Sequence, residues 1–151
     1  MAKIMEELLE EGLVPVEEQP YEVPDNWVWT KVKHIGDTVT GSTPSKGNSV
    51  YYGEAFPLYK PSDLNQGYFV IESGDKLSEE GLAKTRPIPE KSVMVTCIGA
   101  TIGKVGFSRK MGATNQQINS IVAHTMVIPE YIYYVVTSPF FQNSIKENSS
   151  S

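Results

Sequence analysis

Residues 93–121 constrain the fold of this chain more than any other stretch. They begin with an apolar, β-branched run, continue through the turn Gly-Ala-Thr-Ile-Gly-Lys at 99–104, and resume with a second apolar run at 105–107. Two apolar runs separated by glycines predict a pair of neighbouring strands in a buried sheet. We therefore expect a stiff hairpin whose first strand includes residues 93–95 and 97–98, and whose tip presents Lys104 with small polar groups.

Four amide side chains follow the hairpin within five residues, namely Asn115, Gln116, Gln117 and Asn119. An amide donates and accepts hydrogen bonds at the same time, which suits the edge of a base or of another amide. This stretch therefore indicates a recognition surface and not a reaction centre. The same amides would serve equally well as a hydrogen-bonding framework inside the fold.

The rest of the chain predicts short strands, polar loops and two C-terminal helices. Alternating or β-branched residues indicate strands at 27–32, 38–40, 55–59 and 68–72. Ser78 is a suitable N-cap for a short helix at 77–84, and prolines open helices at 129–138 and 139–147. The core-facing residues of the last two helices are expected to be Ile132, Val135, Val136, Phe140, Phe141 and Ile145. These elements predict an α/β (α+β) domain with a curved mixed β-sheet.

Composition limits the class of protein. A chain of 151 residues with 40% hydrophobic residues fits one globular domain. Its single cysteine excludes a disulfide framework, and Cys97, His34 and His124 lie too far apart in sequence to suggest a metal site. No apolar run approaches the roughly 20 residues that a membrane span requires. We therefore expect a cytoplasmic protein with no membrane partner.

The net charge of −5 is distributed unevenly along the chain. Residues 1–25 hold eight acidic residues and one basic residue, whereas the other 126 residues hold twelve basic and ten acidic ones. The acidity thus belongs to a leader, with a short amphipathic helix at 3–13 and a proline-containing connector at 14–26. The weakly basic body is compatible with DNA binding. An acidic leader could also make the chain a protein-interaction module.

The two polar loops offer candidate contacts to nucleic acid. Residues 41–49 carry Ser42, Thr43 and Lys46, and residues 60–67 carry Lys60, Ser62, Asn65 and Gln66. Hydroxyl groups and lysines bind phosphates, while Asn and Gln can make paired hydrogen bonds to adenine.

Catalytic motifs are not found in the sequence. The Gly99–Lys104 turn differs from a nucleotide-binding phosphate loop, because three residues separate its glycines and a valine follows its lysine. A small anion- or nucleotide-binding enzyme that uses this turn remains an alternative. Cys97 lies in an apolar run without a neighbouring histidine, which is typical of an inert thiol. We expect no catalytic residues, no metal and no cofactor.

Five short motifs occur in a familiar order: Trp27-Val-Trp29, Gly41-Ser-Thr-Pro44, Tyr59-Lys-Pro-Ser-Asp-Leu64, Ala100-Thr-Ile-Gly-Lys104 and Asn115-Gln-Gln-Ile-Asn119. With these motifs the chain resembles a target recognition domain of the specificity (S) subunit of type I restriction–modification systems. The resemblance runs from about residue 6 to residue 146.

The resemblance implies a non-catalytic α/β domain that reads one half of a bipartite site in duplex DNA. In the family, two such domains are separated by long helices, which dock the modification (M) subunits that methylate adenine with S-adenosylmethionine, and a restriction (R) subunit completes the assembly. The expected parts of this chain are a leader (1–25), the recognition domain (26–147) and a disordered tail (148–151). We expect a fragment, as the serine-rich end suggests, or a half-size subunit that pairs with a second copy of itself.

Family resemblance also suggests roles for residues. S subunits share the motifs while they read different sequences, so Gly99, Thr101 and Gly103 are expected to shape the hairpin and Lys104 to meet a phosphate. Base choice is expected in residues 46–52 and 65–68. The expected DNA contacts are Ser42, Thr43, Lys46, Lys60, Ser62, Asn65, Gln66, Thr101, Lys104, Asn115, Gln116 and Gln117.

Overall fold

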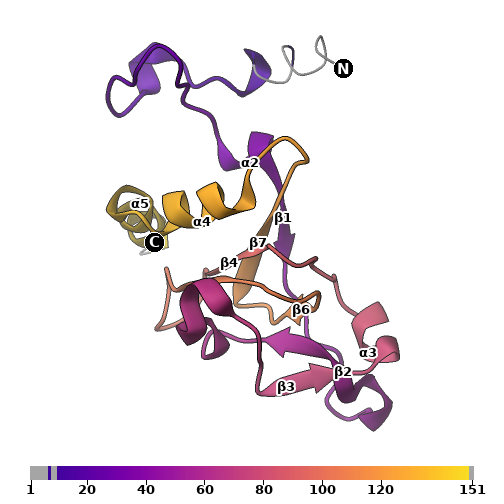
Figure 1. The fold of residues 1–151 in the computed structure, drawn as a ribbon. Helices are drawn as coiled ribbons and strands as arrows, with labels where there is room; N and C mark the ends of the chain where they lie inside the picture. The colour runs from indigo at the N-terminus through magenta and orange to yellow at the C-terminus, as the bar shows by residue number, and fades with distance from the viewer. Residues whose placement is uncertain (1–6, 8–9, 150–151) are drawn as a thin grey trace.

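The computed structural model describes residue 7 and residues 10–149 and shows two β-sheets with helices on their outer faces (Figure 1). The larger sheet has the order β1-β7-β4-β5, with all pairs antiparallel. Its strands are β1 (Gly36–Thr40), β4 (Val93–Thr96), β5 (Val105–Phe107) and β7 (Ile118–Ala123). The β4–β5 hairpin is the one predicted from the sequence, with Val93 opposite Phe107 and Val95 opposite Val105.

The smaller sheet is mixed and has the order β3-β2-β6. Its strands are β2 (Tyr52–Tyr59), β3 (Asp75–Leu77) and β6 (Ala113–Thr114). β2 pairs with β3 in the antiparallel sense and with β6 in the parallel sense. The α/β class with C-terminal helices is confirmed, although the strands divide into two sheets.

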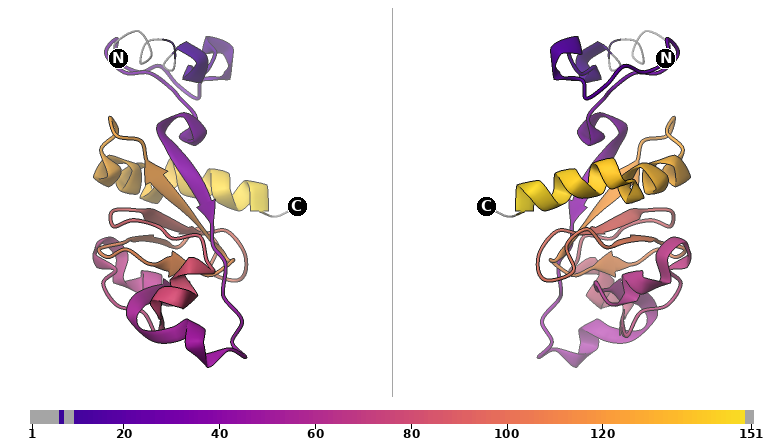
Figure 2. Two further views of the ribbon diagram at one scale, coloured as in Figure 1. Left: turned by 90° about the vertical axis from the view of Figure 1, so that its right-hand side faces the viewer. Right: turned by 90° about the vertical axis from the view of Figure 1, so that its left-hand side faces the viewer.

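The helices are short except at the C-terminal end. The α-helices are α2 (Val32–Ile35), α3 (Glu79–Ala83), α4 (Pro129–Thr137) and α5 (Pro139–Ser149), and the 3-10 helices are η1 (Val16–Glu18), η2 (Ser49–Tyr51) and η3 (Asp63–Phe69). Ser78 caps α3 as predicted, because its side chain accepts a hydrogen bond from the Gly81 N–H. Figure 2 shows residues 10–31 at one end of the described molecule and the smaller sheet at the other. Within the described part of the chain, none of the helices combines the length and apolarity that crossing a bilayer demands.

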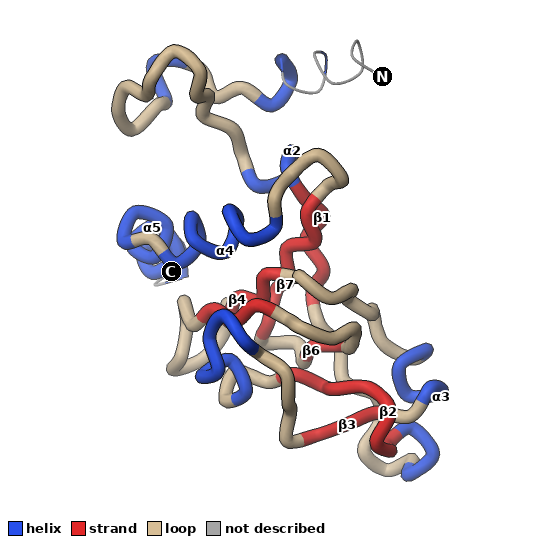
Figure 3. Tube along the Cα trace, in the orientation of Figure 1, coloured by secondary structure: helices blue, strands red, loops and turns tan. Residues whose placement is uncertain are grey.

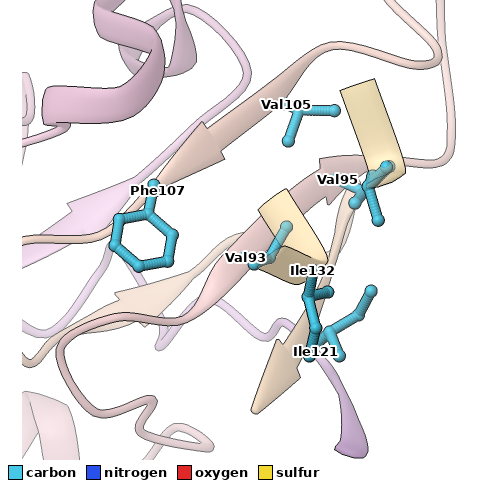
Figure 4. Packing of buried hydrophobic residues seen from close by; sticks show 7 residues of the cluster. Val93, Val95, Val105, Phe107, Ile121 and Ile132 are labelled. Carbon is cyan, nitrogen blue, oxygen red and sulfur yellow. The ribbon is translucent and has the colours of Figure 1, made fainter. Parts of the chain in front are cut away.

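Strand alternation divides the core between the two faces of the larger sheet. Val93 and Val95 of β4 point to the face that α4 covers, where they pack with Ile132 and Val136 (Figure 4). Met94 points to the opposite face and packs with residues from the smaller sheet and η3, including Tyr59 and Leu64. A third cluster of Leu58, Leu77, Leu82 and Ala113 lies under α3. Strands β4 and β5 are therefore buried on both faces, which explains their continuous apolar sequences, whereas the edge strand β1 is largely exposed.

Two predicted strands are absent among the described residues. Residues 27–31 form only an isolated bridge, from Thr30 to Leu13, and Val32 already begins α2. Trp27 and Val28 are 52% and 56% exposed. These residues lack a neighbouring strand that could continue the ladder, so their β propensity is not realised. Residues 68–72 were expected to be a strand, but Tyr68 and Phe69 belong to η3 and Val70 makes one bridge to Ser108.

Several boundaries and burial predictions also differ from the structure. β4 ends at Thr96, so residues 97–98 lie in the turn and not in the strand. Residues 60–67 were expected to be an irregular loop, and η3 occupies most of them. Phe140 is 47% exposed because it packs on the rings of Tyr21 and Trp29 and not in the core. Val135 is half-buried.

Three strands and both ends of the chain also differ in part from what the sequence predicts. Strands β3, β6 and β7 were not predicted, and Leu77 belongs to β3 and not to the helix that follows. Most of the helix expected at 3–13 lies outside the described residues, although residues 10–12 are helical. In the tail expected at 148–151, Asn148 and Ser149 are the last residues of α5, and residues 150–151 lie outside the described part.

Candidate nucleic-acid interface

Three polar loops leave the larger sheet at the same edge. The register places Thr40 of β1 opposite Asn119 of β7, Thr96 of β4 opposite Ile118, and Val95 opposite Val105 of β5. The ends of β1 and β4 therefore lie beside the starts of β5 and β7. We use the name polar edge for the three loops at this edge, which comprise residues 41–48, 97–104 and 115–117. In Figure 3 these loops are drawn in tan.

Gly41 brings the first loop against the amide cluster. Its N–H donates to the Ile118 carbonyl oxygen at 3.0 Å, and a Cβ atom at this position would lie 2.0 Å from the Asn115 carbonyl oxygen. A side chain cannot be accommodated at such a distance, so glycine is required for the close approach. Two residues later, Thr43 Oγ1 donates to Gln116 Oε1 at 2.9 Å.

Asn115 and Gln117 hold each other and the neighbouring hairpin. Asn115 Nδ2 donates to Gln117 Oε1 at 3.0 Å, and the Gln117 N–H donates to Asn115 Oδ1 at 3.1 Å. Gln117 Nε2 donates to the Ile98 carbonyl at 3.4 Å, while the Gln117 carbonyl accepts from the Cys97 N–H at 2.8 Å. These contacts favour the framework alternative for Asn115 and Gln117. Gln116 is exposed and lies between them.

Three backbone N–H groups in the second half of the hairpin turn, those of residues 102–104, donate to carbonyl groups of the hairpin itself. The Gly103 N–H donates to the Thr96 carbonyl, the Lys104 N–H to Thr101, and the Ile102 N–H to Gly99. Phosphate loops instead point such N–H groups at the ligand. This geometry therefore gives no support to the alternative of an anion-binding enzyme that uses residues 99–104.

Lys104 lies at the base of the turn and not at its tip. It directly precedes β5 and is half-buried. Next to it, the Gly103 carbonyl accepts a hydrogen bond of 2.8 Å from Gln142 Nε2, which ties the turn to α5. The exposed part of the turn consists of residues 98–101, so Thr101 is presented at the tip as expected.

The second polar loop starts beside the amide cluster. The Asn115 N–H donates to the Tyr59 carbonyl at 3.0 Å, which places Lys60 next to the polar edge. Lys60 forms an ion pair with Asp75. Asp63 closes the loop, because its carboxylate accepts from the Lys60 N–H at 2.8 Å and from the Gly74 N–H at 3.1 Å.

The side-chain amide of Gln66 makes four hydrogen bonds to the backbone of this loop. Its Nε2 donates to the carbonyls of Asp63 (3.0 Å) and Glu72 (2.7 Å), and its Oε1 accepts from the N–H groups of Ile71 (3.1 Å) and Glu72 (3.2 Å). Two donors and two acceptor positions are the full capacity of an amide. The structure therefore assigns Gln66 to loop closure, whereas its neighbours Ser62 and Asn65 are exposed.

Burial holds Tyr59 in its neutral form at the start of the same loop. Desolvation of the phenol raises the pKa of Tyr59 well above its ordinary value, and the nearby Glu72 charge acts in the same direction. The protonated hydroxyl donates to the Lys110 carbonyl at 3.2 Å.

Two arginines with structural contacts at or near these loops were missed in the sequence. Arg86 Nη1 donates to the Thr40 carbonyl at 2.8 Å, which places an exposed guanidinium where the first loop begins. Arg109 lies 4.3 Å from the ring centroid of Tyr68 and 4.5 Å from that of Phe69, and its Nε donates to the Tyr68 carbonyl at 2.9 Å. Neither arginine belongs to a recognisable motif, and only the folded chain brings them to their partners.

Of the twelve residues expected to contact DNA, eight belong to the polar edge: Ser42, Thr43, Lys46, Thr101, Lys104, Asn115, Gln116 and Gln117. Lys60 adjoins it, and Ser62, Asn65 and Gln66 follow on or next to η3. Among the described residues, His, Cys, Asp and Glu form no group of three or more that could hold a metal ion.

Comparison with known proteins identifies a single family. Residues 24–151 match the family described as "Type I restriction modification DNA specificity domain". The chain is 35% identical over 130 residues to the type I restriction enzyme HindI specificity subunit of Haemophilus influenzae, covering 85% of this chain and 28% of that protein. It is 31% identical over 131 residues to the MjaIX specificity subunit of Methanocaldococcus jannaschii, covering 84% of this chain and 30% of that protein.

A solved structure with the same fold is the HsdS subunit from Thermoanaerobacter tengcongensis. The TM-score is 0.66 at 11% sequence identity, with 99% of this chain and 36% of the other chain covered. This chain therefore spans about a third or less of the length of the relatives that it matches.

Proposed function

Because the chain belongs to the type I restriction modification DNA specificity domain family, we propose that it recognises one half of a bipartite site in duplex DNA. The observation that carries the proposal is the convergence of three polar loops on one sheet edge in a chain of this family. Neither methylation nor cleavage is assigned to the chain itself.

The chemistry of the polar edge supports binding of a duplex. Lys46 and Lys104 contribute positive charge to loops that also carry hydroxyl and amide groups. Arg86 adds a guanidinium at the Thr40 carbonyl, where the first loop begins. Lysines and hydroxyls position a protein on phosphates, whereas side chains that reach the base edges carry the sequence preference. We assign Lys46 and Lys104 to phosphates, and Thr43 with the amides to the support of the loops that reach the bases.

The partners follow from the same proposal. The specificity chain would act with the modification and restriction subunits of its system, and a second copy or a second recognition domain would read the other half-site. A cytoplasmic location follows from a role on DNA beside such enzymes. We propose residues 26–147 as the DNA-binding unit and residues 1–25 as a leader that does not contact DNA.

A titration of randomised duplexes tests the proposal. Affinity should fall steeply as salt rises, because each lysine that meets a phosphate releases counterions. A single module buries about 600–1,000 Å², so a dissociation constant on the order of a micromolar or weaker is expected for one half-site. No salt-sensitive binding at low ionic strength would contradict the proposal, and so would nanomolar binding by a monomer.

Deletion of residues 1–25 separates DNA binding from a protein-interaction role of the leader. The described part of this segment, residue 7 and residues 10–25, lies on the side of α2, which precedes β1 at the opposite end from the polar edge (Figure 1). The whole segment carries eight acidic residues and one basic residue, so its removal reduces repulsion of phosphates. DNA affinity at about 50 mM salt should hold or rise. Loss of binding by a folded truncated chain would place the leader in the site.

A further inference from the structure

The hairpin turn exposes a large nonpolar side chain within the polar edge. Ile98 is 60% exposed. Its own carbonyl accepts from Gln117 Nε2 at 3.4 Å, and the preceding Cys97 N–H donates to the Gln117 carbonyl at 2.8 Å. The amide cluster therefore holds the backbone around Ile98 while the side chain extends into solvent.

Gly99 fixes the direction in which the turn presents this side chain. Its φ of 99° lies in the region that glycine adopts readily and other residues avoid. A Cβ atom at Gly99 would also lie 3.0 Å from Gln117 Nε2. The turn thus has a backbone conformation that favours glycine at position 99, and the Ile98 side chain projects from it.

The position of Ile98 in the sequence agrees with a role in base choice. It lies just before the motif at residues 100–104 and outside the other four motifs by which the chain resembles S subunits. Asn115 and Gln117 belong to a motif, and their side chains bond to each other and to the turn. The motif residues thus hold the backbone of the loops in place, and the Ile98 side chain projects from this backbone into solvent.

Few groups on duplex DNA offer a nonpolar partner. Phosphates are charged and most base edges are polar, but thymine presents a C5-methyl group in the major groove, where apolar side chains contact it. We propose that Ile98 contacts a thymine methyl group in the major groove and thereby favours an A·T pair at one position of the half-site. This inference rests on the proposed function of the chain.

Replacing thymine with uracil tests the contact, since the replacement removes only the methyl group. A preferred duplex is first selected from a randomised pool with the wild-type chain, and each thymine in it is then replaced in turn. At one position, wild-type affinity should fall about fourfold, the effect expected for one buried methyl-sized group. Ile98→Ala should bind the thymine and uracil duplexes with equal affinity at that position, and Ile98→Thr, which keeps the β-branched shape, should retain part of the preference.

Ile128→Ala provides a matched control. Ile128 is 66% exposed and lies between β7 and α4, beyond the end of β7 that is remote from the polar edge. This variant should keep the wild-type ratio of thymine to uracil affinity. The thermal transitions of the Ile98 and Ile128 variants should match that of the wild-type chain, because both side chains are exposed.

The results separate this inference from the proposed function. The wild-type chain could bind duplexes in a salt-sensitive way and yet show the same ratio of thymine to uracil affinity as Ile98→Ala at every position. That result would overturn the inference and leave the proposed function standing. A bent duplex with no uracil effect would indicate insertion of Ile98 between base pairs and would also overturn the inference. If the wild-type chain selects no duplex at all, the proposed function fails and the inference fails with it.

Discussion

A hydrogen bond of 2.9 Å joins the hydroxyl of Thr43 to the amide oxygen of Gln116, although 73 residues separate them in the chain. Two residues before Thr43, the backbone of Gly41 approaches the Asn115 carbonyl too closely for any side chain. The first polar loop and the amide cluster therefore form one connected unit at the end of the larger sheet.

Replacement of Thr43 tests whether this connection supports DNA binding. Thr43→Val keeps the side-chain shape but removes the donor, so about 0.5–1.5 kcal/mol of interaction is lost. Affinity for duplex DNA should fall roughly fivefold if the loop needs the contact. Thr43→Ser keeps the hydroxyl and should bind nearly as well as the wild-type chain. In a double-mutant cycle with Gln116→Ala, the two losses should not add; additive losses would show that the bond does not couple the loops.

Lys104→Ala should weaken binding to matched and mismatched duplexes alike. A flexible ammonium group suits a phosphate better than a base edge, so the slope of log affinity against log salt should decrease by about one. Lys33→Ala is the control, because Lys33 is exposed on α2 at the opposite end of β1. A changed sequence preference in Lys104→Ala would assign the lysine to a base.

Gln66→Ala should destabilise the fold and leave sequence preference nearly unchanged. The substitution removes an amide that makes four hydrogen bonds to the backbone of residues 63, 71 and 72. The backbone N–H and carbonyl groups that lose their hydrogen bonds to Gln66 are accessible to water, which limits the loss. The free energy of unfolding, measured by urea denaturation, should therefore fall by about 1–2 kcal/mol. The neighbouring exposed Asn65 serves as control, and Asn65→Ala should change stability by less than about 0.5 kcal/mol. If Gln66→Ala leaves stability unchanged but relaxes the base preference, Gln66 contacts a DNA base and does not serve loop closure.

Glu130 should make stability depend on pH in the acidic range. Its own backbone N–H at the start of α4 holds the pKa of this carboxyl below its ordinary value of 4.5, and Lys91, whose Nζ lies 3.4 Å from Oε1, acts in the same direction. Because the pKa of Glu130 is lower in the folded than in the unfolded state, its ionised form stabilises the fold at pH values above the ordinary pKa. This contribution is lost as the pH falls through the folded-state pKa. Thermal melts below pH 4.5 should therefore show a weaker pH dependence for Glu130→Gln than for the wild-type chain. Lys91→Ala should retain most of this pH dependence, since the backbone N–H of Glu130 lowers the pKa more than Lys91 does. Complete loss of the pH dependence in Lys91→Ala would show that Lys91 is the larger cause.

The sequence alone determined the features that rest on local interactions. The β4–β5 hairpin forms from apolar runs a few residues apart, Ser78 caps α3 three residues away, and prolines open α4 and α5. Each of these depends on contacts within about a dozen residues, where spacing and residue type are sufficient to indicate the outcome. The order of short motifs likewise indicated the family that the comparisons then showed.

Only the tertiary structure decided which polar groups remain available. Gln66 and Asn65 are adjacent and both exposed, yet the side-chain amide of Gln66 uses its hydrogen-bonding capacity in loop closure. The β-like residues 27–32 have no strand beside them, and Arg86 gains its place from the distant Thr40 carbonyl. Hydrogen-bond capacity is finite and strand propensity needs a partner, so both outcomes depend on residues far away in the chain. The display of Ile98 at the polar edge follows from the same long-range contacts.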